Sequence, residues 1–179
     1  MLLTAVARGD QDALRLLYER HAAAMLRLVR RLTSSSGTAE EILQEAWLAV
    51  WQAARSFRGD SSVRGWLLGV TRRQAHNRLR GMRPILVDLD EAVAVADPRP
   101  GVEDQVLANA EQERVAEGIA ALPEHLREVL ALVLVDELPY QEVSAVLDIP
   151  VGTVKSRMSH ARKRLAAALA TTVAQEDRR

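Results

Sequence analysis

Apolar residues recur at helical spacing through most of this chain, which is the pattern of amphipathic helices. Ala, Leu, Arg, Glu and Gln dominate the composition, and the alternating apolar and polar residues of a half-buried strand are almost absent. Gly and Pro fall at discrete breaks between the periodic segments. We therefore expect an all-α protein.

The first part of the chain contains three helical segments separated by short polar breaks. Thr38 is the expected N-cap of the second segment, because Glu41 follows it at the spacing of a capping box. The predicted helices cover residues 12–32, 38–57 and, after the loop 58–62, a stretch that ends near residue 82. We expect them to form an N-terminal helical bundle over residues 1–82.

An acidic stretch that contains Pro84, Pro98 and Pro100 follows the bundle. Prolines and an excess of acids favour an extended segment, so we expect residues 83–103 to be a flexible linker. A second domain is expected over residues 104–175. It should contain four helices. The first covers residues 102–121, the second begins at Pro123, the third is short and runs from Pro139 to residue 147, and the last covers residues 151–171.

The formal net charge of zero hides a strong asymmetry along the chain. Residues 1–82 carry 13 Lys and Arg against 7 acids, whereas residues 83–120 carry 3 against 9. Two windows, 72–83 and 151–165, each hold five basic residues and no acid. This pattern suggests two anion-binding surfaces, although two solvated helix faces would give the same charges.

Residues 139–165 have the pattern of a helix-turn-helix: a short helix, a turn at residues 148–150, and a longer basic helix. At 100° per residue, Val154, Met158, Ala161 and Leu165 fall on one face of the longer helix, which must then dock on the preceding helices. Polar groups lie opposite, with cations at both flanks. The alternative is an ordinary amphipathic helix with a solvated basic face.

The sequence gives little support to an enzyme. It contains no cysteine, which excludes disulfides, thiolate metal sites and cysteine nucleophiles. It has no Gly-rich phosphate loop with Lys, no His-Glu-x-x-His and no Gly-x-Ser-x-Gly, and its four histidines are dispersed. We expect no catalytic residue, no cofactor and no metal. Since no apolar run approaches the length of a membrane helix and no signal peptide is evident, we expect no membrane insertion and a cytoplasmic location.

Five short motifs occur in one order along the chain, and together they are more specific than any one alone. They are AEEILQEAW at 39–47, FRGDSSVRGWL at 57–67, VTRRQAHNRLR at 70–80, LPE at 122–124 and GTVKSR at 152–157. With these motifs the chain resembles the extracytoplasmic-function (ECF) sigma factors, a group of the sigma-70-like family of bacterial RNA polymerase sigma factors.

The resemblance implies a region 2 bundle and a region 4 helix-turn-helix domain joined by a linker. It also implies a transcription initiation factor that binds RNA polymerase core, through the β′ coiled coil and the β flap. Such a factor recognises a minus-35 element as duplex DNA and opens DNA at a minus-10 element. Members of the family are commonly held inactive by an anti-sigma factor, which is therefore an expected partner.

An acidic ridge on the second helix is the candidate polymerase-binding site that the resemblance implies. An acidic patch on an otherwise basic domain would repel DNA, so it needs another purpose. Acids near a helix N-terminus also interact favourably with the helix dipole, but this alternative accounts poorly for Glu45, which lies further along the helix. The ridge comprises Glu40, Glu41, Gln44 and Glu45.

The resemblance also assigns candidate DNA contacts in both domains. Small polar residues in the loop 58–62 could form hydrogen bonds with the edge of a base that has left the stack. One face of the third helix is basic and could contact the same strand. The minus-10 candidates are Arg58, Asp60, Ser61, Ser62, Arg72, Arg73, His76, Asn77 and Arg80. The minus-35 candidates are Thr153, Lys155, Ser156, Arg157, Ser159, His160, Arg162, Lys163 and Arg164.

Two other functions stay open at this point. A helix-turn-helix regulator could bind operator DNA without polymerase core, although it would not need the acidic ridge and the basic third helix. A helical adaptor that binds only protein would leave the basic C-terminal face unexplained.

Overall fold

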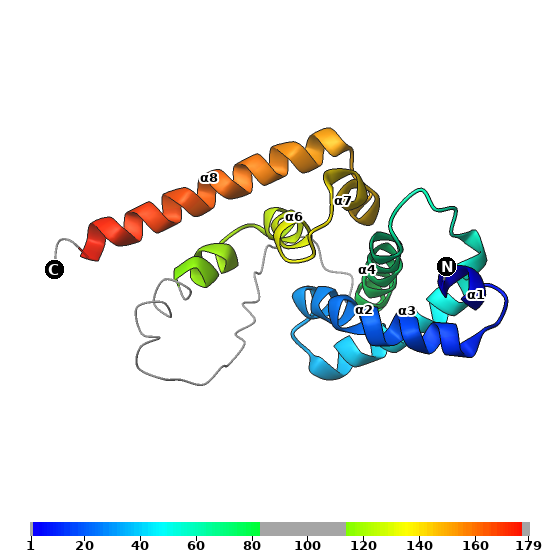
Figure 1. Ribbon diagram of the computed structural model, residues 1–179. Helices are drawn as coiled ribbons and strands as arrows, with labels where there is room; N and C mark the ends of the chain where they lie inside the picture. The colour runs from blue at the N-terminus through cyan, green and yellow to red at the C-terminus, as the bar shows by residue number, and fades with distance from the viewer. Residues whose placement is uncertain (1, 83–113, 177–179) are drawn as a thin grey trace, which may run out of the picture. The chain divides into compact units, whose positions relative to one another are not determined.

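The computed structural model describes residues 2–82 and 114–176, with side chains described up to residue 170. Every regular element in these two ranges is a helix, which confirms the all-α prediction (Figure 1). The predicted linker at 83–103 lies outside the described residues.

The N-terminal helices follow the predicted pattern closely, with one addition at the start of the chain. That addition is α1, a short helix that the periodicity did not indicate. The helices are α1 (Leu2–Val6), α2 (Gln11–Leu32), α3 (Ser36–Ala53), the 3₁₀ turn η1 (Ala54–Ser56) and α4 (Val63–Met82).

The N-cap of α3 is Ser35, so the prediction of Thr38 is wrong. Ser35 has an extended backbone, and its side-chain oxygen accepts a hydrogen bond from the backbone N–H of Thr38 at 3.3 Å. The hydroxyl of Thr33 in turn accepts a bond from the N–H of Ser35. Thr38 is thus the third helical residue, and its N–H is one of the donors that a cap satisfies.

Helices α2, α3 and α4 pack against one another around a shared apolar core. Val29, Ala39, Ile42 and Ala75 lie at its centre and are fully buried. Alanine at two of these positions allows the helix backbones to approach closely, while larger side chains at the edge of the cluster fill the remaining space. The predicted N-terminal bundle is therefore present.

The C-terminal helices also match the predicted order. Residues 114–120 are helical, and they are followed by α6 (Glu124–Leu134), α7 (Tyr140–Leu147) and α8 (Val151–Glu176). Pro123 and Pro139 occupy the N-cap positions of α6 and α7, where a missing N–H costs nothing. Helix α8 extends five residues beyond its predicted end at residue 171.

A tight turn separates α7 from α8, as the helix-turn-helix pattern predicts. Asp148 ends α7 in the left-handed conformation, with φ at 55°. The N–H of Ile149 donates to the carbonyl of Ser144 at 3.1 Å, and the hydroxyl of Ser144 donates to the carbonyl of Ile149. These bonds satisfy the exposed end of α7 and fix the direction in which the chain leaves it.

The chain divides by its contacts into two compact units. Their described parts are residues 2–82 with 138–150, and residues 114–137 with 151–176. Helix α7 therefore belongs to the first unit by contact, where it packs on α4. The domain boundaries expected from the sequence, 1–82 and 104–175, stay predictions, because they follow sequence regions rather than contacts.

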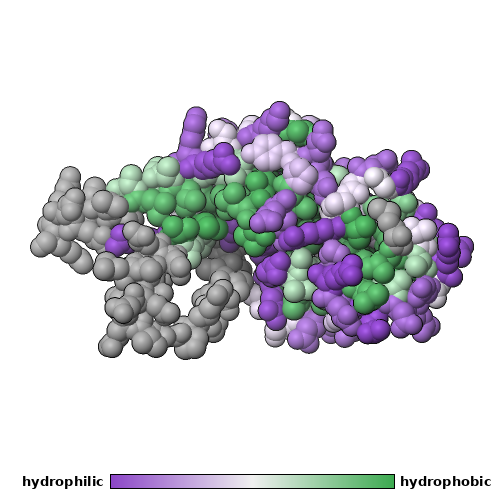
Figure 2. Space-filling view, viewed as in Figure 1, coloured by the Kyte–Doolittle hydropathy of each residue, from purple (hydrophilic) through white to green (hydrophobic). Residues whose placement is uncertain are grey.

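The second unit is held together by α6 and α8. Leu126, Val129 and Leu130 of α6 are buried, as are Met158 and Ala161 of α8. Figure 2 shows apolar side chains gathered over these two helices, whereas the surface of the first unit in this view is mostly hydrophilic. None of the helices in the described ranges has the length and hydropathy needed to cross a membrane.

The N-cap assignment can be tested by stability. Ser35→Ala should lower the free energy of unfolding by about 1 kcal/mol, because the N–H of Thr38 loses its acceptor. Thr38→Ala serves as the matched control and should change that free energy by less than about 0.5 kcal/mol. Urea denaturation followed by tryptophan fluorescence reports on the bundle, because all three tryptophans lie between residues 47 and 66. Equal losses in the two variants would contradict the assignment.

Candidate nucleic-acid interface

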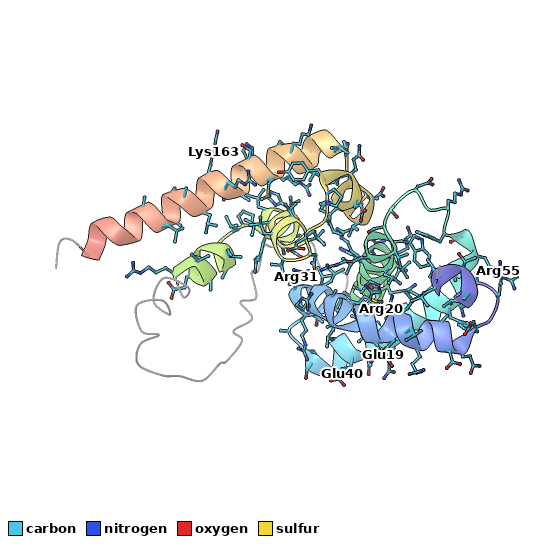
Figure 3. The ribbon with its side chains drawn as sticks, in the orientation of Figure 1. Glu19, Arg20, Arg31, Glu40, Arg55 and Lys163 are labelled. Atoms are coloured by element: carbon cyan, nitrogen blue, oxygen red, sulfur yellow. The ribbon has the colours of Figure 1, made fainter. Side chains whose placement is uncertain are left out.

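Helix α8 buries the face that the sequence pattern predicted and exposes the opposite one. Val154, Met158 and Ala161 are between 0% and 1% exposed, and Leu165, the fourth residue predicted on this face, is half-buried. Lys163 projects outward from the helix in Figure 3. The other candidates are also accessible: Thr153 and Arg157 are half-buried, and Lys155, Ser156, Ser159, His160, Arg162 and Arg164 are exposed.

The exposed face of α8 combines hydrogen-bonding groups with cations, as a major-groove helix requires. The hydroxyl of Ser156 donates to the carbonyl of Thr153 at 3.0 Å, and its oxygen keeps lone pairs that can accept from a base donor. The imidazole of His160 is exposed one turn further along the same face. Cations lie exposed on both sides of these groups, at Lys155, Arg162, Lys163 and Arg164.

The second candidate surface lies on α4 and on the loop that precedes it. Leu67, Leu68 and Ala75 anchor α4 in the bundle at 0–1% exposure, and this anchoring turns the basic side of α4 outward. Ser61, Arg72 and His76 are half-buried, whereas Arg58, Asp60, Ser62, Arg73, Asn77 and Arg80 are exposed. The loop candidates thus lie directly before the helix that carries the others.

Ser62 is the most engaged of these candidates. Its hydroxyl oxygen accepts a hydrogen bond from the N–H of Gly65 at 3.0 Å and so caps α4. Its own N–H and hydroxyl both donate to the carboxylate of Glu142 in α7, at 3.1 and 2.5 Å. Arg72, two turns along α4, donates to the carbonyl of Leu147 at the end of α7 at 3.5 Å. Two minus-10 candidates therefore contact α7.

Near the start of α4, His21 of α2 is held neutral by its surroundings. Partial burial lowers the pKa of His21, and the positive charges of Arg64 and Arg20 lower that pKa further. Because the ordinary pKa of histidine is about 6.5, this lowering favours the neutral imidazole at neutral pH. The neutral form of His21 adds no charge to the arginines of this region.

The acidic ridge of α3 is tied to α4 by an arginine that the sequence analysis did not single out. Arg78 donates to the carboxylates of both Glu41 and Glu45, which lie one turn apart. Glu40 and Gln44 are exposed on the same helix, and Figure 3 shows Glu40 at its outer side. No local pattern could have indicated this contact, because the partners are 33 and 37 positions apart.

Comparison with known proteins matches both parts of the chain to one family. Residues 17–83 match the model for sigma-70 region 2, and residues 112–165 match a model for sigma-70 region 4. The ECF RNA polymerase sigma-E factor of Escherichia coli K12 is 36% identical over 172 residues, covering 91% of this chain and 90% of the relative. The chain belongs to the ECF sigma factors.

Further relatives agree with this assignment. The RNA polymerase sigma factor CnrH of Cupriavidus metallidurans is 32% identical over 177 residues, covering 94% of this chain and 93% of its own. The structure of CnrH in complex with the cytosolic domain of CnrY matches with a TM-score of 0.66 at 25% identity, over 95% of this chain and 96% of the other. A sigma factor RpoE from Bartonella quintana, solved with the anti-sigma factor NepR, shares the fold with a TM-score of 0.65 at 21% identity. The match covers 87% of this chain and 96% of the other.

These matches confirm the family inferred from the sequence motifs and the function that the family implies. This ECF sigma factor is a transcription initiation factor that works with RNA polymerase core at promoters. A regulator that binds operator DNA without polymerase is not favoured. The roles of individual residues are a separate matter and stay predictions.

The link between the ridge and α4 can be measured by a double-mutant cycle. Arg78→Ala and Glu45→Ala, alone and combined, should show a coupling of about 0.5 kcal/mol in the free energy of unfolding, because both side chains are partly solvated. The coupling should shrink in high salt. Glu40→Ala combined with Arg78→Ala is the control and should be additive. Additivity in the Glu45 cycle as well would refute the link.

Proposed function

We propose that this sigma factor uses three surfaces of its described helices in initiation. The acidic ridge of α3 binds the β′ coiled coil of polymerase core, the face of α4 with its preceding loop holds the opened minus-10 strand, and the exposed face of α8 reads the minus-35 duplex. The observation that carries this proposal is the segregation of charge: the acids of the ridge lie on α3, and the cations lie on α4 and α8.

The ridge suits a basic protein partner because its charges are already positioned. Arg78 contacts Glu41 and Glu45 together, which orders their side chains before the partner arrives. An ordered acid loses less conformational entropy when it binds. Glu40 and Gln44 are exposed beside this pair and complete a surface about two turns long.

The face of α4 suits a single strand because it combines arginines with small polar groups. Arginines along α4 neutralise phosphates, while Asp60, Ser61 and Ser62 can bond to the edge of an extruded base. The aromatic rings nearby are engaged in packing: Phe57 and Trp66 meet edge to face with ring centroids 5.7 Å apart. Base recognition here therefore relies on polar contacts more than on stacking, and DNA opening relies on polymerase as well as on sigma.

Control by an anti-sigma factor is part of the proposal. The sigma factor RpoE of Bartonella quintana, which has the same fold, has been solved in complex with the anti-sigma factor NepR. An anti-sigma factor acts by covering surfaces that polymerase or DNA would otherwise bind. We further propose that the protein has no catalytic activity of its own and acts in the cytoplasm, where polymerase and promoters are found.

Transcription in vitro tests the proposal directly. Added to bacterial polymerase core, the protein should start transcription from a distinct subset of a randomised promoter library. Glu41→Gln with Glu45→Gln should weaken binding to core by about tenfold, because two of the ridge charges are lost, and should reduce transcription accordingly. Asp12→Asn with Glu124→Gln removes the same charge elsewhere and should behave as wild type. Normal binding to core by the ridge variant would remove the ridge assignment.

Variants of the exposed face of α8 can distinguish residues that contact bases from residues that contact phosphates. Ser156→Ala or His160→Ala should change discrimination among minus-35 sequences by about 1–3 kcal/mol, since each removes a group that can reach a base edge. Arg162→Ala should instead weaken binding to all sequences and reduce the salt slope by about one. Competition binding at several salt concentrations distinguishes the two. A sequence-selective loss in Arg162→Ala would mean that this arginine reads bases.

A further inference from the structure

The tripeptide Arg-Gly-Asp occurs twice in the chain, at residues 8–10 and at residues 58–60. In both copies the glycine has a positive φ, 92° at Gly9 and 83° at Gly59, which glycine adopts without strain. Apart from its chain neighbours, a Cβ atom at either glycine would meet no described atom within 4 Å. Each glycine is therefore needed for a sharp turn rather than for close packing. The arginine of each turn is exposed.

A hydrogen bond joins the first turn to the segment that leads into the second. The Nε–H of Arg55, in η1, donates to the carbonyl of Ala7 at 3.0 Å, although the two residues are 48 positions apart. Helix α1 and η1 also pack together, and Leu3, Val6 and Ala54 are buried there. Figure 3 shows Arg55 at the outer edge of the first unit, beside α1. The bond therefore holds the guanidinium by its Nε and leaves the two terminal nitrogens available to a ligand.

Three arginines thus gather in one place, which we call the α1–η1 corner: Arg8, Arg55 and Arg58. Arg8 directly follows the carbonyl that Arg55 binds, and Arg58 lies three positions after Arg55. None of the three forms an ion pair with another residue of the described ranges, whereas Arg15 and Arg78 are both paired with acids. An anion that binds at the corner therefore has no described acid to displace from these arginines.

The two aspartates of the repeated tripeptide are placed for other contacts. The carboxylate of Asp10 accepts a hydrogen bond from the N–H of Ala13 at 2.9 Å and caps α2. Asp60 is exposed in the loop, where the proposed function directs it to the edge of a base. Three arginines against these two acids leave the corner with a net positive charge. A guanidinium that is already held in place is well suited to bind a phosphate through two parallel hydrogen bonds.

The position of the corner in the chain matches the path of an opened strand. In the proposed function an extruded base enters the loop 58–62, and the arginines of α4 follow that loop. The corner precedes the same loop, because η1 leads into it. The loop therefore has cations before it and after it. A strand whose base enters the loop can run along α4 on one side of that base and toward the corner on the other.

We propose that the α1–η1 corner is a binding site for the DNA backbone, in which Arg8 and Arg55 hold phosphates of the opened strand on the side of the extruded base away from α4. This inference rests on the proposed function of the loop and α4, and it adds a second anchor for the same strand. Contacts to phosphates fix the position of a nucleic acid without reading its sequence. Anchors on both sides of the base keep the backbone in place while the base leaves the stack.

Holoenzyme assembled from this chain and polymerase core tests the corner on a promoter selected from the library and opened in advance by mismatches. Arg8→Gln and Arg55→Gln should each weaken binding about three- to fivefold and reduce the salt slope by about 0.7, the value for one phosphate of a single strand. The opened strand is then shortened stepwise from each end. Shortening it on one side of the extruded base should abolish both losses, whereas shortening it on the other side should leave them unchanged.

Two further variants separate charge from structure. Arg55→Lys keeps the charge and should weaken binding less than about twofold, because a lysine can still neutralise a phosphate. If Arg55 only ties η1 to α1, Arg55→Lys and Arg55→Gln should be equally impaired and Arg8→Gln should match wild type. Arg30→Gln removes an exposed arginine near the other end of α2 and should also match wild type. Urea denaturation checks that each variant is folded.

Wild-type affinity and salt slope in both Arg8→Gln and Arg55→Gln would overturn the corner site, as would losses that persist however the strand is shortened. If wild-type protein fails to redirect core polymerase, the proposed function is wrong instead. The free chain is therefore also titrated with a pool of short fluorescent single-stranded DNA, which needs no promoter. The same reduction of the salt slope in the two variants is expected there, and equal slopes in wild type and variants would again overturn the site.

Discussion

The whole first unit depends on how α4 is packed. This one helix must bury a side against α2 and α3, present cations to solvent, and receive α7. Its buried row includes Leu67, Leu68 and Ala75, and also Thr71, a polar residue with no exposure. The hydroxyl of Thr71 donates to the carbonyl of Leu67 at 2.8 Å, so the helix itself satisfies this buried polar group.

Because its buried side is fixed, α4 places charges at defined positions on its other sides. Arg78 falls next to α3 and binds two glutamates there, whereas Arg73 and Arg80 point to solvent. An acidic ridge can therefore exist on a unit that is basic as a whole. Without a cation between them, two carboxylates one turn apart would repel each other.

Most of the fold could be predicted from the sequence because burial follows helical periodicity. Val154, Met158 and Ala161 show this, since their spacing alone identified the face of α8 that the structure buries. The cap of α3 could not be chosen in the same way. Ser35 and Thr38 are both good caps, and the capping-box cue favoured the wrong one because it says nothing about where the chain turns into the helix.

The contacts that matter most for the candidate site lay beyond the reach of the sequence. Arg78 with its glutamates, and Glu142 with Ser62, join residues between 33 and 80 positions apart. Neither partner carries a local signal of the contact. Once α2, α3 and α4 are packed, however, the position of Arg78 beside Glu41 and Glu45 follows from the helix register.

The apolar and charged contacts of this molecule therefore have different roles. The buried rows of α2, α3 and α4 hold the bundle, since each large apolar side chain that is fully buried contributes about 1.5–3 kcal/mol. The ion pairs and hydrogen bonds on the surface of α4 are solvated, and exposed pairs of this kind contribute about 0–1 kcal/mol each. Contacts that weak can be exchanged for contacts with another molecule without unfolding the bundle. A factor that must bind polymerase, bind DNA and be released from both needs its exchangeable contacts at the surface and its stability in the core.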